Sequence, residues 1–243
     1  MSTVIATSVL PDSTANDTLT IGATGDSVVI GGNLLTMNTL QDAGGNAIFV
    51  SDGSGTITSA PNFPGALKLI SSQTASGSAS LAFTSGLDST YDVYCFKFVN
   101  INPTTDNTSF DFQASTTGAA PYGVQTTTCT FCAQHNEADN SYDLAYRADK
   151  DLVQSTDYQP LGYFVGNGSD ECCAGELYLF KPSDTTYAKQ FYARVQTYSG
   201  TDYAFDCFTG GYFNTASAIS AIDFKCAGGN FDGIIALYGI SKS

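Results

Sequence analysis

Residues 187–198, Tyr-Ala-Lys-Gln-Phe-Tyr-Ala-Arg-Val-Gln-Thr-Tyr, decide the fold class. Apolar and polar residues alternate here with a period of two, which places them on opposite faces of an extended chain. The two sets are Phe191, Ala193 and Val195 on one face and Tyr192, Arg194 and Gln196 on the other. One apolar and one wet face are typical of a strand in an antiparallel sandwich.

Similar runs recur from residue 66 to the end, and no stretch keeps the 3.6-residue period of a helix. The predicted strands are Ala66–Gln73, Ser78–Thr84, Tyr91–Ile101, Ser109–Ser115, Val124–Ala133, Tyr158–Val165, Gly175–Lys181, Tyr187–Tyr198, Tyr203–Asn214, Ala218–Cys226 and Gly233–Ile240. Turn-forming residues separate them, and this pattern predicts an all-β, jelly-roll-like double sheet over residues 66–243. The side chains expected on wet faces include Asp111, Gln113, Asp223 and Lys225. The run Tyr94–Val99 is apolar on both faces, so we expect it in the centre of a sheet or at a subunit contact.

Composition excludes several classes of partner. The 243 residues carry a formal net charge of −14, so no basic patch is available for nucleic acid or an anionic membrane surface. The apolar runs fall far short of the ~20 residues that a spanning helix needs. The first residues contain neither Lys nor Arg, so no signal peptide and no membrane insertion are expected.

The first 60 residues differ from the rest. Phe49 is their only aromatic residue, and short aliphatic runs alternate with turns rich in Gly, Asp and Asn. A segment of this size with so few bulky apolar groups cannot enclose its own core. We therefore predict that residues 1–60 are an oligomerisation and attachment segment, and that residues 61–65 are a linker. The side chains expected along the shared axis are Leu19, Ile21, Val29, Leu35, Ile48, Val50 and Ile57.

Seven cysteines are an odd number for a disulfide framework, so we expect synthesis in a reducing cytoplasm. The spacing of Cys129, Cys132 and His135 could supply three zinc ligands, with Cys172 or Cys173 as the fourth. Strand positions 129 and 132 face opposite sides of a sheet, however, and cysteine is often a small buried apolar residue. We therefore expect no metal and no cofactor.

Several phrases resemble a known family. The phrases are LTIGATGDSVVIGGN (19–33), NTLQDAGGNAIFVSDGSGTIT (38–58), GALKLISSQTASGSASLAFTSGLDSTYDVY (65–94), HNEAD (135–139), GELYLFKPSDTTYAKQFYA (175–193) and GNFDGIIALYGI (229–240). They are similar to tail-fibre and other appendage proteins of tailed bacteriophages, especially marine phages. The resemblance implies a homotrimeric structural protein of the virion, assembled in the host cytoplasm and joined to other virion proteins through its N-terminal segment. A capsid decoration or head-fibre protein is the first alternative.

Tyrosines in turn-rich stretches suggest where such a protein would bind. The candidates for contact with a host-surface glycan are Tyr142, Tyr146, Tyr158, Tyr163 and His135. Flat amphipathic rings beside Asp and Asn side chains can stack on a sugar and hydrogen-bond it. The block Asn140–Tyr158 is the longest expected loop, and the segment that contains His135 is expected to be a polar loop. Packing of these rings at subunit contacts is an equally good interpretation.

Catalysis is not expected. The sequence has no G-x-S-x-G elbow, and His135 is its only histidine. The acids Asp149, Asp151, Asp170 and Glu171 keep one alternative open, that of a spike enzyme that cleaves polysaccharide with paired carboxylates.

Overall fold

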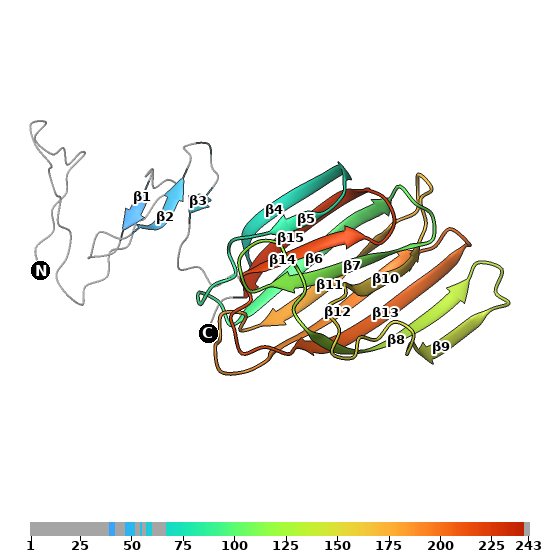
Figure 1. Cartoon of the computed structure of the whole chain (residues 1–243). Helices are drawn as coiled ribbons and strands as arrows, with labels where there is room; N and C mark the ends of the chain where they lie inside the picture. Colours follow the sequence, from blue (N-terminus) through green and yellow to red (C-terminus); the bar gives the residue numbers. More distant parts are fainter. Residues whose placement is uncertain (1–38, 42–46, 52–53, 55–56, 60–66, 241–243) are drawn as a thin grey trace, which may run out of the picture. The chain divides into compact units, whose positions relative to one another are not determined.

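The computed structural model describes residues 39–41, 47–51, 54, 57–59 and 67–240, and it contains strands but no helix (Figure 1). Within these residues nothing forms a helix long and apolar enough to cross a membrane. The chain divides into two compact units, Met1–Phe63 and Pro64–Ser243, which we describe separately.

The first unit contains a small antiparallel sheet in the order β1-β2-β3. Its strands are β1 (Thr39–Gln41), β2 (Ala47–Ser51) and β3 (Ile57–Ser59). Of the residues predicted on a shared axis, Ile48 and Val50 fall on β2 and Ile57 falls on β3, and the Val50 side chain is half-buried. The other four, Leu19, Ile21, Val29 and Leu35, lie outside the described residues.

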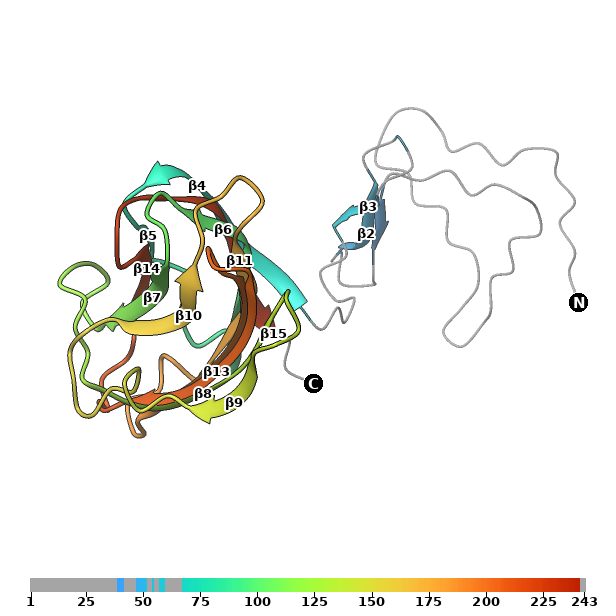
Figure 2. The same ribbon diagram turned by 90° about the vertical axis from the view of Figure 1, so that its right-hand side faces the viewer.

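The second unit, which we call the head, is a sandwich of two antiparallel sheets (Figure 2). The larger has eight strands, in the order β4 (Leu67–Ser78), β15 (Phe231–Ile240), β6 (Val93–Pro103), β11 (Cys173–Phe180), β12 (Lys189–Tyr198), β13 (Tyr203–Phe213), β8 (Thr126–Asn136) and β9 (Tyr142–Tyr146). The smaller has four, in the order β10 (Gln159–Val165), β7 (Thr108–Ser115), β14 (Ala221–Cys226) and β5 (Leu81–Phe83). The predicted all-β class is confirmed, and each of the eleven predicted runs overlaps one of these strands.

Aromatic rings fill the space between the two sheets. Phe224 of the small sheet meets Phe96 and Phe98 of the large sheet with ring centroids 5.1 and 5.2 Å apart, and Phe112 meets Phe191 at 5.0 Å. These edge-on contacts bury the rings almost completely, which supplies the main hydrophobic stabilisation of the head.

The alternation predicted for residues 187–198 is confirmed on β12, where the three apolar side chains point into the core and the three polar-face side chains are exposed. Strand β6, which contains the doubly apolar run Tyr94–Val99, lies inside the large sheet between β15 and β11. Its expected central position is therefore confirmed.

The wet outer face predicted for the small sheet is wrong. Asp111, Gln113 and Asp223 are buried, and residues 147–158, which we call the strap, contact Gln113 and Asp223. The Gln113 side-chain amide donates to the main-chain oxygens of Thr156 and Asp157 at 3.1 and 2.6 Å. A polar face can thus be covered when the covering segment supplies hydrogen bonds to it.

The loop predicted over Asn140–Tyr158 is wrong in its first part. Strand β9 occupies Tyr142–Tyr146 and pairs with β8, which continues through His135 to Asn136. His135 therefore lies on a strand and not in a polar loop. The strand was missed because β9 lies at the sheet edge and has no buried apolar face that alternates with an exposed one.

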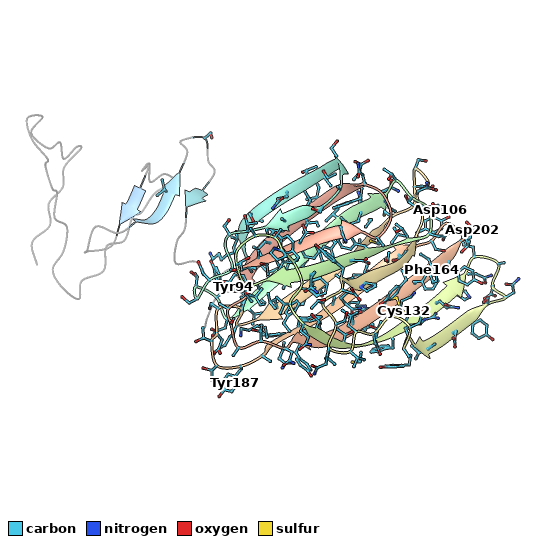
Figure 3. The ribbon with its side chains drawn as sticks, in the orientation of Figure 1. Tyr94, Asp106, Cys132, Phe164, Tyr187 and Asp202 are labelled. Carbon is cyan, nitrogen blue, oxygen red and sulfur yellow. A yellow bond between two sulfur atoms is a disulfide. The ribbon has the colours of Figure 1, made fainter. Side chains whose placement is uncertain are left out.

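The expectation of no disulfide is also wrong. Cys132 on β8 and Cys207 on β13 lie directly opposite each other and are bonded, with their Cα atoms 4.2 Å apart (Figure 3). Such a separation is typical of antiparallel partners that exchange no backbone hydrogen bonds. An odd cysteine count does not prevent one bonded pair, and the remaining five cysteines are free.

Candidate functional site

Exposed apolar side chains gather on the outer face of the eight-stranded sheet. Of the twelve large apolar side chains that are exposed in the described part of the chain, nine belong to this face. The nine are Leu67, Leu69, Val99, Phe131, Tyr142, Leu144, Tyr146, Tyr192 and Ile234. Scattered exposed apolar residues are normal, but this concentration on one face is typical of a binding surface.

Strand register builds a row of rings across this face. Tyr146 lies opposite Phe131, Phe131 lies opposite Phe208, and Phe208 lies opposite Arg194. The rings of Phe131 and Phe208 stack with centroids 5.0 Å apart and planes 7° from parallel, and the Arg194 guanidinium carbon sits 4.9 Å from the centre of the Phe208 ring. We call these four residues the aromatic row.

Hydrogen bonds fix both ends of the aromatic row. Arg194 donates from Nε and Nη2 to the two carboxylate oxygens of Asp206 at 2.9 and 2.6 Å. This bidentate contact lowers the pKa of Asp206, so its carboxylate stays charged. At the other end the Tyr146 hydroxyl donates to Asp151, which raises the pKa of Tyr146. The row therefore presents preoriented rings rather than freely rotating ones.

Beside the aromatic row the surface is depressed. Ala133 and Ala204 carry the smallest outward side chains here, and around them lie His135, Gln196 and Asp206. Two adjoining depressions, of about 280 and 310 Å³, both have His135 and Ala204 in their lining. The second also extends to Tyr198 and Glu137. Together we call them the sheet hollow. The carboxylate of Glu137 raises the pKa of Tyr198, so the phenol remains a donor.

Three of the five predicted contact residues reach this face. His135 and Tyr142 lie opposite each other on β8 and β9 with ring centroids 6.1 Å apart, and Tyr142 is 75% exposed. His135 Nε2 also lies 3.0 Å from Asp139 Oδ1, a pairing with a neighbouring carboxylate. Tyr146 completes the set within the aromatic row.

The structure excludes the other two tyrosines from this face. Tyr163 is only 3% exposed and its hydroxyl donates to the Pro160 carbonyl at 3.2 Å. Burial raises its pKa to about 12. The Tyr158 hydroxyl donates to Asp223 Oδ2 at 2.8 Å, and Lys225 Nζ lies 3.8 Å from the centre of its ring. Both rings therefore take part in the packing between the strap and the rest of the head.

Sequence reasoning missed Phe131, Phe208, Arg194 and Asp206. Their alternation within β8, β12 and β13 indicates which face they occupy, but only strand order and register bring them side by side. No local motif in the sequence carries that information.

The zinc interpretation does not fit. Cys129 is exposed on the outer face, whereas Cys132 points inward and is bonded to Cys207. Across the described ranges, no three His, Cys, Asp or Glu side chains lie close enough together to hold a metal ion.

The acids considered for polysaccharide cleavage are engaged separately. Glu171 Oε2 accepts from the Gly168 amide at 2.6 Å within a turn. Asp149 pairs with Lys150 at 3.1 Å in the strap, and Asp151 accepts from Tyr146. These three carboxylates are held by local contacts, and Asp170 is exposed.

The outer face therefore presents exposed aromatic rings, with carboxylate, amide and imidazole groups beside them that can hydrogen-bond to hydroxyl groups. No protein-family model matches the chain, and no curated protein or solved structure shows significant similarity to it.

Proposed function

We propose that this chain is a non-enzymatic tail-fibre or related appendage subunit of a tailed phage, and that it binds a host-surface glycan through the outer face of its eight-stranded sheet. The observation that carries this proposal is the aromatic row beside the sheet hollow. The family assignment rests on the sequence phrases quoted above.

A glycan suits this face for two physical reasons. Sugar rings have apolar faces that stack on flat side chains, and their hydroxyls need donors and acceptors close by. The exposed rings of Phe131, Tyr142 and Tyr146 supply the first, while Gln196, Asp206 and His135 supply the second. The net charge of −14 disfavours an acidic polysaccharide, so the proposed ligand is a neutral one.

We further propose that the head is a jelly roll enlarged by four strands. Folding one long hairpin into two Greek keys pairs its first strand with its last, its second with its seventh, and so on. The pairings β4·β15, β5·β14, β6·β11 and β7·β10 follow that rule. The extra strands β12, β13, β8 and β9 extend one sheet beyond β11, and they carry the whole aromatic row.

The proposed mode of action is multivalent. If residues 1–60 join three chains, three weak sites act on one surface, and the gain over a single site is about 10²- to 10⁴-fold. Weak single sites are therefore sufficient for stable adsorption.

Binding of the full chain to purified neutral surface polysaccharide from a host tests the proposal. Phe131→Ala and Tyr146→Ala should each weaken binding, because each stacked ring contributes about 0.5–1.5 kcal/mol, roughly 2- to 12-fold in Kd. Tyr187→Ala is the matched control: this ring is as exposed as Tyr142 and lies at the end of the head opposite Asp106 and Asp202 (Figure 3). Equal losses in all three variants, or none in the first two, would contradict the proposal.

A further inference from the structure

A second hollow lies outside the outer sheet face. Its volume is about 580 Å³, and it shares no residue with the aromatic row or the sheet hollow. The segment 115–125 forms most of its wall, and Thr156 of the strap and Asn214 after β13 complete it. We call it the loop hollow.

Hydrogen bonds join these segments and hold the loop hollow in shape before any ligand binds. The Gly123 amide donates to the Ala114 carbonyl at 3.1 Å, and the Asn214 amide donates to the Gln125 carbonyl at 2.7 Å. The side chains of Asn214 and Gln125 are also joined, with Nδ2 donating to Oε1 at 3.2 Å. Little ordering is therefore needed when a ligand enters.

The lining is polar but carries no charged side chain. It presents hydroxyls from serine and threonine, the amides of Gln125 and Asn214, and the ring of Tyr122 next to Pro121. Burial raises the pKa of Tyr122, so its phenol stays protonated and able to donate. An anionic ligand would find no cation here, and a metal ion would find no carboxylate.

We propose that the loop hollow is a second carbohydrate site, which takes one neutral sugar unit stacked on Tyr122 and hydrogen-bonded to Asn214 and the threonine hydroxyls. It goes beyond the glycan contact proposed above because it lies on other elements of the head and has room for a single unit, such as a chain end or a branch.

The sharpest test fills the loop hollow without removing a polar group. A Cβ atom at Gly123 would lie 3.7 Å from the Cβ and the carbonyl oxygen of Thr156, which is ordinary contact. Gly123→Leu should therefore fold and occupy the space. Gly210→Leu is the matched control, because a Cβ there meets nothing within 4 Å and the residue lies on the outer face. Tyr122→Ala and Asn214→Ala test the same site by removing its proposed contacts with the sugar.

The measurement is saturation-transfer NMR of the full chain with neutral methyl glycosides, a uronic acid and a linear polyol. We expect saturable binding of a neutral glycoside, weakened at least tenfold in Gly123→Leu, Tyr122→Ala and Asn214→Ala and unchanged in Gly210→Leu. Absence of glycoside binding by the unmodified chain, or equal binding of uronic acid or polyol, would overturn the proposal.

The pattern of variants separates the two carbohydrate sites. Loss in Phe131→Ala with retention in Gly123→Leu assigns the probe to the outer face and refutes the loop hollow. The converse result supports the loop hollow and leaves the outer-face proposal to the polysaccharide experiment.

Discussion

Removal of the Cys132–Cys207 disulfide should destabilise the head strongly. The two cysteines are 75 residues apart in sequence, so the bond closes a long loop in the unfolded chain. The chain-entropy relation gives about 15 cal/mol/K for this loop length, or about 4.5 kcal/mol at 25 °C. The substitution itself adds little, because alanine is nearly as small and apolar as cysteine.

The assay is thermal unfolding of the full chain followed by circular dichroism. The double variant Cys132→Ala with Cys207→Ala should unfold roughly 10–15 °C lower, since a domain of this size loses about 2–4 °C per kcal/mol. Cys129→Ala, an exposed and unpaired neighbour on β8, is the control and should change little. Titration of the unreduced, denatured chain should find five free thiols.

Two results would refute this reasoning. Seven reactive thiols in the unreduced protein would show that the bond does not form. A double variant that unfolds within about 3 °C of the unmodified chain would show that the bond does not constrain folding as the loop length requires.

Three further changes test the packing around the strap and the large sheet. Burial raises the pKa of Asp111 from 3.8 to about 6, so the folded chain holds this proton more tightly than the unfolded chain does. The free energy of unfolding should therefore fall by about 3 kcal/mol as pH rises through that range. Asp111→Asn should flatten this dependence in urea titrations at pH 4 to 7.5, and an unchanged slope would contradict the burial. Tyr158→Phe removes the hydroxyl that donates to Asp223 Oδ2 and should cost about 1–3 kcal/mol in the same titrations, whereas Tyr187→Phe should cost nothing measurable. Gly175→Ala should yield little folded protein, because its Cβ would sit 2.2 Å from the Arg194 carbonyl oxygen on the neighbouring strand; a soluble variant with an unaltered unfolding temperature would show that β11 and β12 are not so close.

The strands of the head could be predicted because most have one buried apolar face. The alternation of Phe191, Ala193 and Val195 with polar residues predicts such a face from the sequence alone, and the structure places all three side chains inward. The strand β9 could not be found in this way, since Tyr142 and Leu144 are exposed and nothing buried alternates with them.

Burial of the small sheet's polar face was beyond prediction for a different reason. Asp111 and Gln113 alternate with apolar residues as wet-face side chains do, and their burial arises from segments distant in sequence, such as the strap at Gln113. The alternation of apolar and polar residues along a strand does not reveal that a distant segment will cover its polar face.

In the candidate site, too, some residues could be predicted from the sequence and others depend on how distant strands pair. Exposed rings at Tyr142 and Tyr146 were named from sequence, but the stack of Phe131 on Phe208 arises from the register of β8 with β13. Tyr163 was named incorrectly, although its place two residues from the inward-facing Leu161 and Val165 indicated a buried ring.

A structure of the full chain bound to an oligosaccharide from a neutral host-surface polysaccharide tests the central proposal most directly. The account predicts sugar rings lying against Phe131 and Tyr146, with hydroxyls within hydrogen-bond distance of Gln196 or Asp206. A complex in which the same rings are covered by a neighbouring subunit, and the sugar lies elsewhere or is absent, would contradict it.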